Sequence, residues 1–167
     1  MVESKTAESA ATAEASELRV NEKKWTPGLW KAGWTALPDV VFERQQALGL
    51  DPLDINILLH IASYWWRRDS KPFPSKVTIA KAIGVDPRTV QRRIADMEKD
   101  GLVRREERRV VGHGSKTNIY HLDGLIAAAK PYAQEKIEKR ARENAERAAR
   151  AARKGKPKLR VVKSDDE

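Results

Sequence analysis

Side chains that can bind a polyanion are concentrated in one short stretch of the sequence. Three arginines, Arg88, Arg92 and Arg93, lie within six consecutive positions, together with Thr89 and Gln91. A guanidinium group binds a phosphate or a guanine edge through paired hydrogen bonds, and hydroxyl and amide groups also bind bases and phosphates. These residue types at this spacing predict contacts with base edges or flanking phosphates of nucleic acid.

The element that must position these side chains is a helix expected over residues 86–100. Asp86-Pro87 is a helix start signal, because the aspartate caps free N–H groups and the proline suits the first helical position. Apolar residues recur at i, i+4 and i+7, namely Val90, Ile94 and Met97. At 100° per residue, Arg88 and Arg92 lie nearly opposite this stripe. The helix is therefore expected to bury its apolar face and to turn its cationic face outward.

A shorter helix is expected just before it, over residues 75–83. Ser75 can cap its start, and Gly84 can end it in the left-handed conformation. Val85 then fills the corner between the helices. Such a pair places its second helix in a major groove, and the alternative is an ordinary helical hairpin with a solvated charged face. In the first interpretation, the side chains that anchor the first helix on the DNA backbone are Ser75, Lys76 and Thr78.

A β-hairpin is expected directly after the helix pair, over residues 102–122. Residues 102–110 are strand-like at both ends, residues 112–115 form a turn cluster, and residues 117–122 contain β-formers. A basic hairpin behind a groove-binding helix is a wing, which approaches backbone phosphates or a minor groove. The predicted contacts of the wing come from Arg108, Arg109, His113, Ser115 and Lys116.

The sequence around these elements resembles the winged helix-turn-helix domains of phage and plasmid replication initiators and related bacterial regulators. The resemblance covers roughly residues 30–133 and includes the helix pair and several short runs. These runs are Gly33–Pro38, Ala47–Leu50, Pro72–Ser75 and Asn118–Tyr120. The resemblance implies a mainly α fold with a small β wing, and binding of double-stranded DNA.

The domain is expected to span residues 25–122 and to contain two further helices. One runs over residues 38–49. The other begins at Asp51-Pro52 and stays apolar as far as Trp65, which indicates burial on more than one side.

Three tryptophans, Trp25, Trp30 and Trp34, precede these helices. In related domains a strand at Trp34–Ala36 pairs beside the wing, which favours a place in the core for the three rings. The alternative is an exposed surface for base stacking or for a protein partner, because tryptophan supplies a large contact area at little cost in entropy.

Three segments flank the domain. Residues 1–24 are polar and contain no aromatic side chain, which predicts disorder. A helix is expected over residues 123–154, kinked or broken near Pro131. Its stripe of mostly small residues is compatible with a solvated helix, a weak dimerisation helix or a helix that lies on DNA. Residues 155–167 form a flexible tail that is first basic and then acidic, and its basic part would add sequence-independent affinity for DNA.

The charge distribution supports a polyanionic partner. The chain carries a formal net charge of +9, and residues 67–122 contain 14 basic and 7 acidic side chains. The excess positive charge therefore lies on the predicted helix pair and wing, and also on the C-terminal tail.

Several classes of function are not expected. The chain has no cysteine, and its three histidines, His60, His113 and His121, fall on separate elements. No glycine-rich phosphate loop or nucleophile elbow occurs. We therefore expect no enzymatic activity, no cofactor and no metal. No stretch is apolar enough to span a membrane, and a cytoplasmic, nucleoid-associated protein is expected.

The pattern favours a sequence-specific binder of double-stranded DNA that regulates transcription through a recognition helix (86–100) and a basic wing (102–122). The alternative is a plasmid- or phage-type replication initiator, or a protein that recruits a helicase loader. A lesser alternative is a winged-helix protein-interaction module. Expected protein partners are a replication or transcription protein and a second copy of the chain, bound through the C-terminal helix or the Trp-rich segment.

Overall fold

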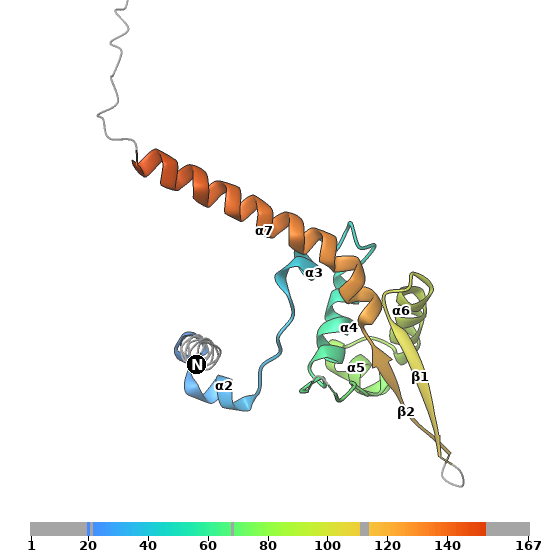
Figure 1. The fold of residues 1–167 in the computed structure, drawn as a ribbon. Helices are drawn as coiled ribbons and strands as arrows, with labels where there is room; N and C mark the ends of the chain where they lie inside the picture. Colours follow the sequence, from blue (N-terminus) through green and yellow to red (C-terminus); the bar gives the residue numbers. More distant parts are fainter. Residues whose placement is uncertain (1–19, 21, 68, 111–113, 153–167) are drawn as a thin grey trace, which may run out of the picture.

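The computed structural model describes residue 20 and residues 22–67, 69–110 and 114–152 (Figure 1). The elements are α2 (Pro27–Ala32), α3 (Asp39–Glu43), α4 (Pro52–Ala62), α5 (Lys76–Ile83), α6 (Pro87–Lys99), β1 (Arg104–Val110), β2 (Gly114–His121) and α7 (Asp123–Ala152). The expected class, mainly α with a small β wing and a C-terminal helix, is confirmed. The predicted tail at 155–167 lies outside the described residues. Of the predicted disordered segment 1–24, only residues 20 and 22–24 are described, and they are helical.

Helix α4 is the central support of the domain. Its start is fixed by a capping box, in which the Asp51 carboxylate accepts hydrogen bonds from the backbone of Leu53 and Asp54 at 2.8 and 2.9 Å. The Asp54 carboxylate accepts the Asp51 N–H in return, at 3.0 Å. The side chains of α4 that are wholly buried are Ile57, Leu58 and Ile61. Helices α5 and α6 both pack on α4, which agrees with the burial on more than one side that its apolar pattern indicated.

Helices α5 and α6 form the expected helix-turn-helix. Ser75 Oγ accepts the Thr78 N–H at 2.9 Å and caps α5. Gly84 ends the helix with φ of 81°, a left-handed conformation that glycine adopts without steric cost. The Asp86 carboxylate accepts the Arg88 N–H at 2.7 Å and caps α6. The predicted stripe of α6 is buried, namely Val90, Ile94 and Met97.

The wing is an antiparallel pair, with Arg104 opposite His121 and Arg108 opposite Lys116. The register shifts between Glu106 and Arg108, so β2 carries one extra residue there. The third strand expected at Trp34–Ala36 is not present. The described sheet consists of β1 and β2, and residues 34–36 are exposed outside it. Beside β2, the Pro72 carbonyl instead accepts the Tyr120 N–H, at 2.9 Å.

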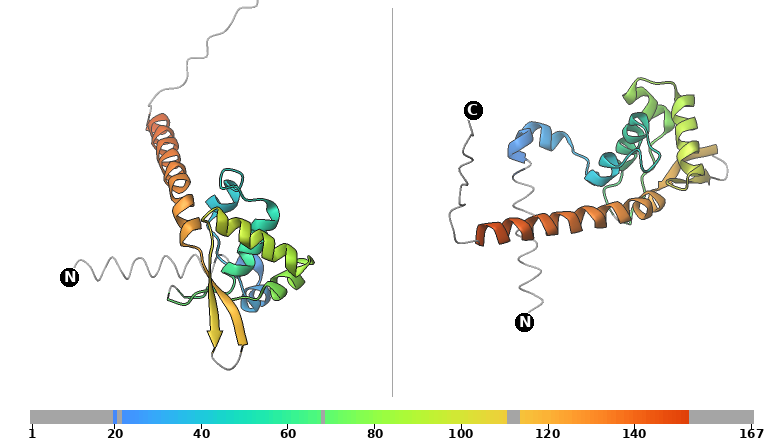
Figure 2. Two further views of the ribbon diagram at one scale, coloured as in Figure 1. Left: turned by 90° about the vertical axis from the view of Figure 1, so that its right-hand side faces the viewer. Right: turned by 90° about the horizontal axis from the view of Figure 1, so that it is seen from above.

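Helix α7 leaves the wing and runs past the domain as one continuous helix (Figures 1 and 2). Leu125 and Ala129 are buried, and the Leu125 N–H donates to the Leu102 carbonyl at 2.8 Å. A kink or a break was expected near Pro131, and of the two the break does not occur, because the helix continues through Pro131. Pro131 is on an exposed side of the helix, where water can bond the carbonyl that loses its helical partner.

Helix α3 is shorter than the helix expected over residues 38–49, since it ends at Glu43 and the chain continues in turns to Gly49. Two ion pairs join this region to α7. Lys136 Nζ lies 2.5 Å from the Glu43 carboxylate, and Arg44 lies 3.3 Å from the Glu135 carboxylate. These pairs hold α7 at the point where it leaves the domain.

Residues 22–38, here called the arm, extend from the domain on the side of α3. Both figures place α2 on the opposite side of the domain from α6 and the wing. Helix α2 has no buried residue, and the side chains of Trp25 and Trp34 are exposed. The expected burial of the three tryptophans in the core is therefore wrong. Residues 34–36 do not pair with the strands of the wing, so no strand hydrogen bonds hold them on the domain.

Candidate nucleic-acid interface

The outward face of α6 presents hydrogen-bond donors to solvent. Arg88, Gln91 and Arg92 are exposed, and Thr89 is half-buried beside them. These four residues line a shallow hollow that runs along the helix. Among the described residues, neither Arg88 nor Arg92 forms an ion pair, so both guanidinium groups are available to a ligand.

A second hollow lies between the start of α5, the middle of α6 and the base of the wing. Its polar lining includes Ser75, Lys76, Gln91 and Thr117. Lys76 Nζ donates to Gln91 Oε1 and so joins the two helices. Ser75 Oγ and the hydroxyl of Thr78 lie 2.8 Å apart, beside the free N–H groups of the first turn of α5. A phosphate could accept hydrogen bonds from this group.

The base of the wing is fixed to α6 by Glu98 and Arg105. The Glu98 carboxylate accepts the Arg105 N–H at 2.9 Å and Arg105 Nε at 2.7 Å. Burial acts to raise the pKa of Glu98, but the hydrogen bonds and the charge of Arg105 together lower it below its usual value. The wing therefore holds a defined orientation relative to the recognition helix.

Within the wing, Arg108 is braced by its neighbours. Its Nε donates to the Thr117 carbonyl and its Nη2 donates to the Thr117 hydroxyl, both at 3.0 Å. Its guanidinium carbon lies 4.9 Å from the centroid of the Phe73 ring. Arg109, Ser115 and Lys116 belong to the strands, but their side chains are not described, and His113 lies outside the described residues. The predicted contacts of these four residues stay predictions.

Comparison with known proteins identifies the central part of this arrangement. Residues 48–103 match the model of a helix-turn-helix domain family. With the wing that follows these residues, the fold is that of a winged helix-turn-helix domain. None of the curated proteins matches the chain.

Three solved structures are similar to the chain at low identity. The N-terminal domain of the DnaD protein from Geobacillus kaustophilus HTA426 is 16% identical, with a TM-score of 0.48, and the match covers 71% of this chain and 96% of that one. A possible transcriptional regulator from Methanosarcina mazei Go1 is 21% identical, with a TM-score of 0.39 and coverage of 65% and 85%. The YusO protein from Bacillus subtilis is 14% identical, with a TM-score of 0.37 and coverage of 87% and 99%.

The structure directs Arg93 into the winged helix-turn-helix domain, away from the outward face of α6. Its guanidinium group pairs with the Asp51 carboxylate, and its Nε lies 3.1 Å from Asp54 Oδ1. The side chain of Arg93 is only 23% exposed. Arg93 was expected to face base edges or phosphates, and the structure instead gives it a place in the contact between α6 and α4.

Asp54 is the buried acidic group of this contact. Burial of the Asp54 carboxylate raises its pKa to about 6, and repulsion from Asp96 and Asp100 contributes a smaller part of this increase. Arg93 Nε approaches this carboxylate as an ion pair without hydrogen-bond geometry, which leaves the desolvation of the carboxylate only partly offset.

Sequence reasoning missed Arg105 and Glu98 as the pair that orients the wing. Seven positions separate them, one at the end of a helix and one in a strand, and no local pattern marks such a pair. It also gave no role to Asn118, which lines the second hollow. Alternation along β2 could have placed Asn118 on the same side as Tyr120.

Two further observations concern other kinds of site. No group of three metal-ligating side chains occurs in the described part of the chain. None of the described helices is both long and apolar enough to cross a membrane.

Proposed function

We propose that the chain binds double-stranded DNA in a sequence-specific manner and acts as a transcriptional regulator. The observation that carries the proposal is the outward face of α6, where Arg88, Gln91 and Arg92 are exposed while the opposite face of the same helix is buried. A helix held in this way enters a major groove, where arginine and glutamine side chains distinguish bases by paired hydrogen bonds.

The second hollow supports a division of roles. Ser75, Lys76 and Thr78 lie at the start of α5, beside the free N–H groups of its first turn. Groups of this kind fix a protein on the phosphate backbone and carry little sequence information. In the proposed complex, α6 distinguishes the bases, whereas the start of α5 and the wing hold the backbone.

The proposed role is one of binding without catalysis. The hollows beside α6 are open surfaces, and those near α3 and the arm are lined mostly by apolar side chains, which supports a role in binding. We further propose that the protein is cytoplasmic and associated with the nucleoid, where its DNA would be found.

The test is recovery of genomic DNA bound by the full chain, followed by binding measurements on the recovered sites at two salt concentrations. The proposal predicts one shared motif whose affinity falls with added salt while its preference over random DNA is kept. Motifs that overlap promoters support regulation, whereas repeated motifs in an AT-rich region beside a replication gene point to an initiator. Random fragments released together at modest salt would refute sequence-specific binding.

A further inference from the structure

The arm exposes large apolar side chains that the DNA-binding surface does not use. Trp25, Leu29 and Trp34 are 56, 61 and 46% exposed. Exposed apolar groups of this size, gathered in one short segment, mark an interaction surface. The arm lies on the opposite side of the domain from α6 and the wing (Figures 1 and 2).

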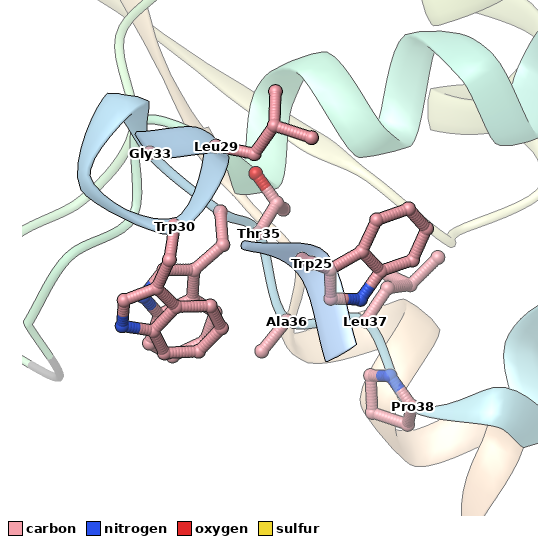
Figure 3. A pocket seen from close by; sticks show the side chains of 9 residues that line it. Trp25, Leu29, Trp30, Gly33, Thr35, Ala36, Leu37 and Pro38 are labelled. Carbon is pink, nitrogen blue, oxygen red and sulfur yellow. The ribbon is translucent and has the colours of Figure 1, made fainter. Parts of the chain in front are cut away.

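These side chains surround a hollow with a defined shape. Trp25 and Trp30 lie on opposite sides of it, with Ala36 between them (Figure 3). The rings of Trp30 and Trp34 are stacked, with centroids 5.0 Å apart and planes within 9° of parallel. Leu37 also lines the hollow. The result is an aromatic slot with an aliphatic floor, whose chemistry suits an apolar side chain.

The arm that forms the slot is basic in its sequence. Lys23, Lys24 and Lys31 are exposed, and the arm contains one acidic residue, the half-buried Glu22. Lys24 Nζ lies 5.7 Å from the centroid of the Trp25 ring, so a cation lies directly beside the slot. An occupant with an apolar anchor and acidic neighbours would complement both the apolar lining of the slot and the positive charge of the arm.

The lining favours a peptide over single-stranded nucleic acid. Base stacking needs free ring faces, but Trp30 and Trp34 stack on one another and use one face each. Leu37 and its neighbours Ala36 and Pro38 carry no side-chain donor for a base edge, and Thr35 is the one lining residue with a hydroxyl group. An aliphatic floor of this kind suits the apolar side chain of a polypeptide.

We propose that the arm is a docking site for an acidic peptide segment of a partner protein, which inserts an apolar side chain between Trp25 and the stacked pair of Trp30 and Trp34. The site is independent of the proposed DNA binding, because it lies on the opposite side of the domain. A partner can therefore be held while α6 remains free to bind DNA.

The experiment selects binding peptides from a random displayed library on the full chain and then measures the affinity of a selected peptide for variants. The first variant is Trp25→Ser with Trp34→Ser, and the second is Lys23→Glu, Lys24→Glu and Lys31→Glu. Neither set of changes touches a buried side chain, so the domain stays folded. The matched control is Ile137→Ser, which removes an apolar side chain that is 61% exposed on α7.

The proposal predicts selected peptides that combine aspartate or glutamate with a large apolar residue. Their affinity should fall at least about tenfold in the tryptophan variant and also fall in the lysine variant, while Ile137→Ser leaves it unchanged. Selected peptides without acidic residues would overturn the proposal, as would unchanged affinity in the tryptophan variant. Two other results would overturn the proposal because they would identify a different occupant of the slot. One is a poly-dT oligonucleotide bound through the same tryptophans. The other is a dimer of the chain that the tryptophan variant converts to monomer.

Discussion

Arg93 on the recognition helix α6 forms an ion pair with Asp54 on α4, with 3.1 Å between Nε and Oδ1. Its neighbour Arg92 is exposed on the outward face of the same helix and pairs with no described residue. Two adjacent arginines therefore have different surroundings, one inside the domain and one toward solvent. Their substitution should separate the stability of the domain from the recognition of DNA.

The first prediction concerns these two arginines. Arg93→Ala leaves the buried Asp54 carboxylate without its cation and should lower the free energy of unfolding by about 1–3 kcal/mol. Arg92→Ala should leave that free energy nearly unchanged and reduce discrimination between the recovered site and random DNA by about 1–3 kcal/mol. Denaturant titration and competition binding measure the two effects. If the two variants had the same free energy of unfolding, the structural role that we assign to Arg93 would be wrong.

The second prediction concerns the pH dependence of stability. Burial, with repulsion from Asp96 and Asp100, raises the pKa of Asp54 from 3.8 to about 6. Because the folded chain holds this proton more tightly than the unfolded chain, the stabilising contribution is complete below pH 3.8 and is lost as the pH rises through about 6. Asp54→Asn removes this titration.

The stability of the wild-type chain relative to Asp54→Asn should therefore fall between about pH 4 and about pH 7, by at most about 3 kcal/mol. Denaturant unfolding of both proteins across this range measures the difference. Asparagine keeps a side-chain oxygen that can accept the Asp51 N–H, so the cap of α4 is largely retained. A difference that instead grows with pH would show that Arg93 keeps the carboxylate ionised.

Local signals in the sequence predicted much of this domain, because caps and apolar stripes act within a few residues. Ser75, Gly84 and Asp86 mark ends of α5 and α6 as expected. The errors concern contacts between segments distant in the chain. Whether an arginine faces outward depends on the acid that another helix brings to it, and Asp54 lies 39 positions from Arg93. Likewise, no local pattern predicts the hydrogen bond from the Tyr120 N–H to the Pro72 carbonyl, because the two residues are far apart in the sequence.

The third prediction tests the backbone contacts. Lys76 lies at the start of α5, in the hollow shared with α6 and the wing. Lys76→Ala should weaken binding to cognate and random DNA alike and lower the magnitude of the salt slope by about 1. Lys139→Ala is the matched control, because Lys139 is an exposed lysine on α7 outside the proposed interface. A selective loss of cognate binding in Lys76→Ala would mean that Lys76, through its bond to Gln91, acts in base recognition.

The fourth prediction concerns the joint between the end of α6 and the start of α7. A Cβ atom added to Gly124 would lie 1.8 Å from the Gly101 carbonyl oxygen, so Gly124→Ala forces the backbone of α7 away from that turn. The shift would also strain the hydrogen bond from the Leu125 N–H to the Leu102 carbonyl. We expect a loss of about 1–3 kcal/mol in the free energy of unfolding.

Gly28→Ala is the control for this change, since Gly28 is also in the first turn of a helix and has nothing within 4 Å of an added Cβ. That variant should be neutral or slightly stabilising, because alanine favours helix. Thermal and denaturant unfolding compare the two proteins. Equal stability of Gly124→Ala and Gly28→Ala would contradict this prediction. It would show that the start of α7 can move away from the turn at Gly101 at little cost in free energy.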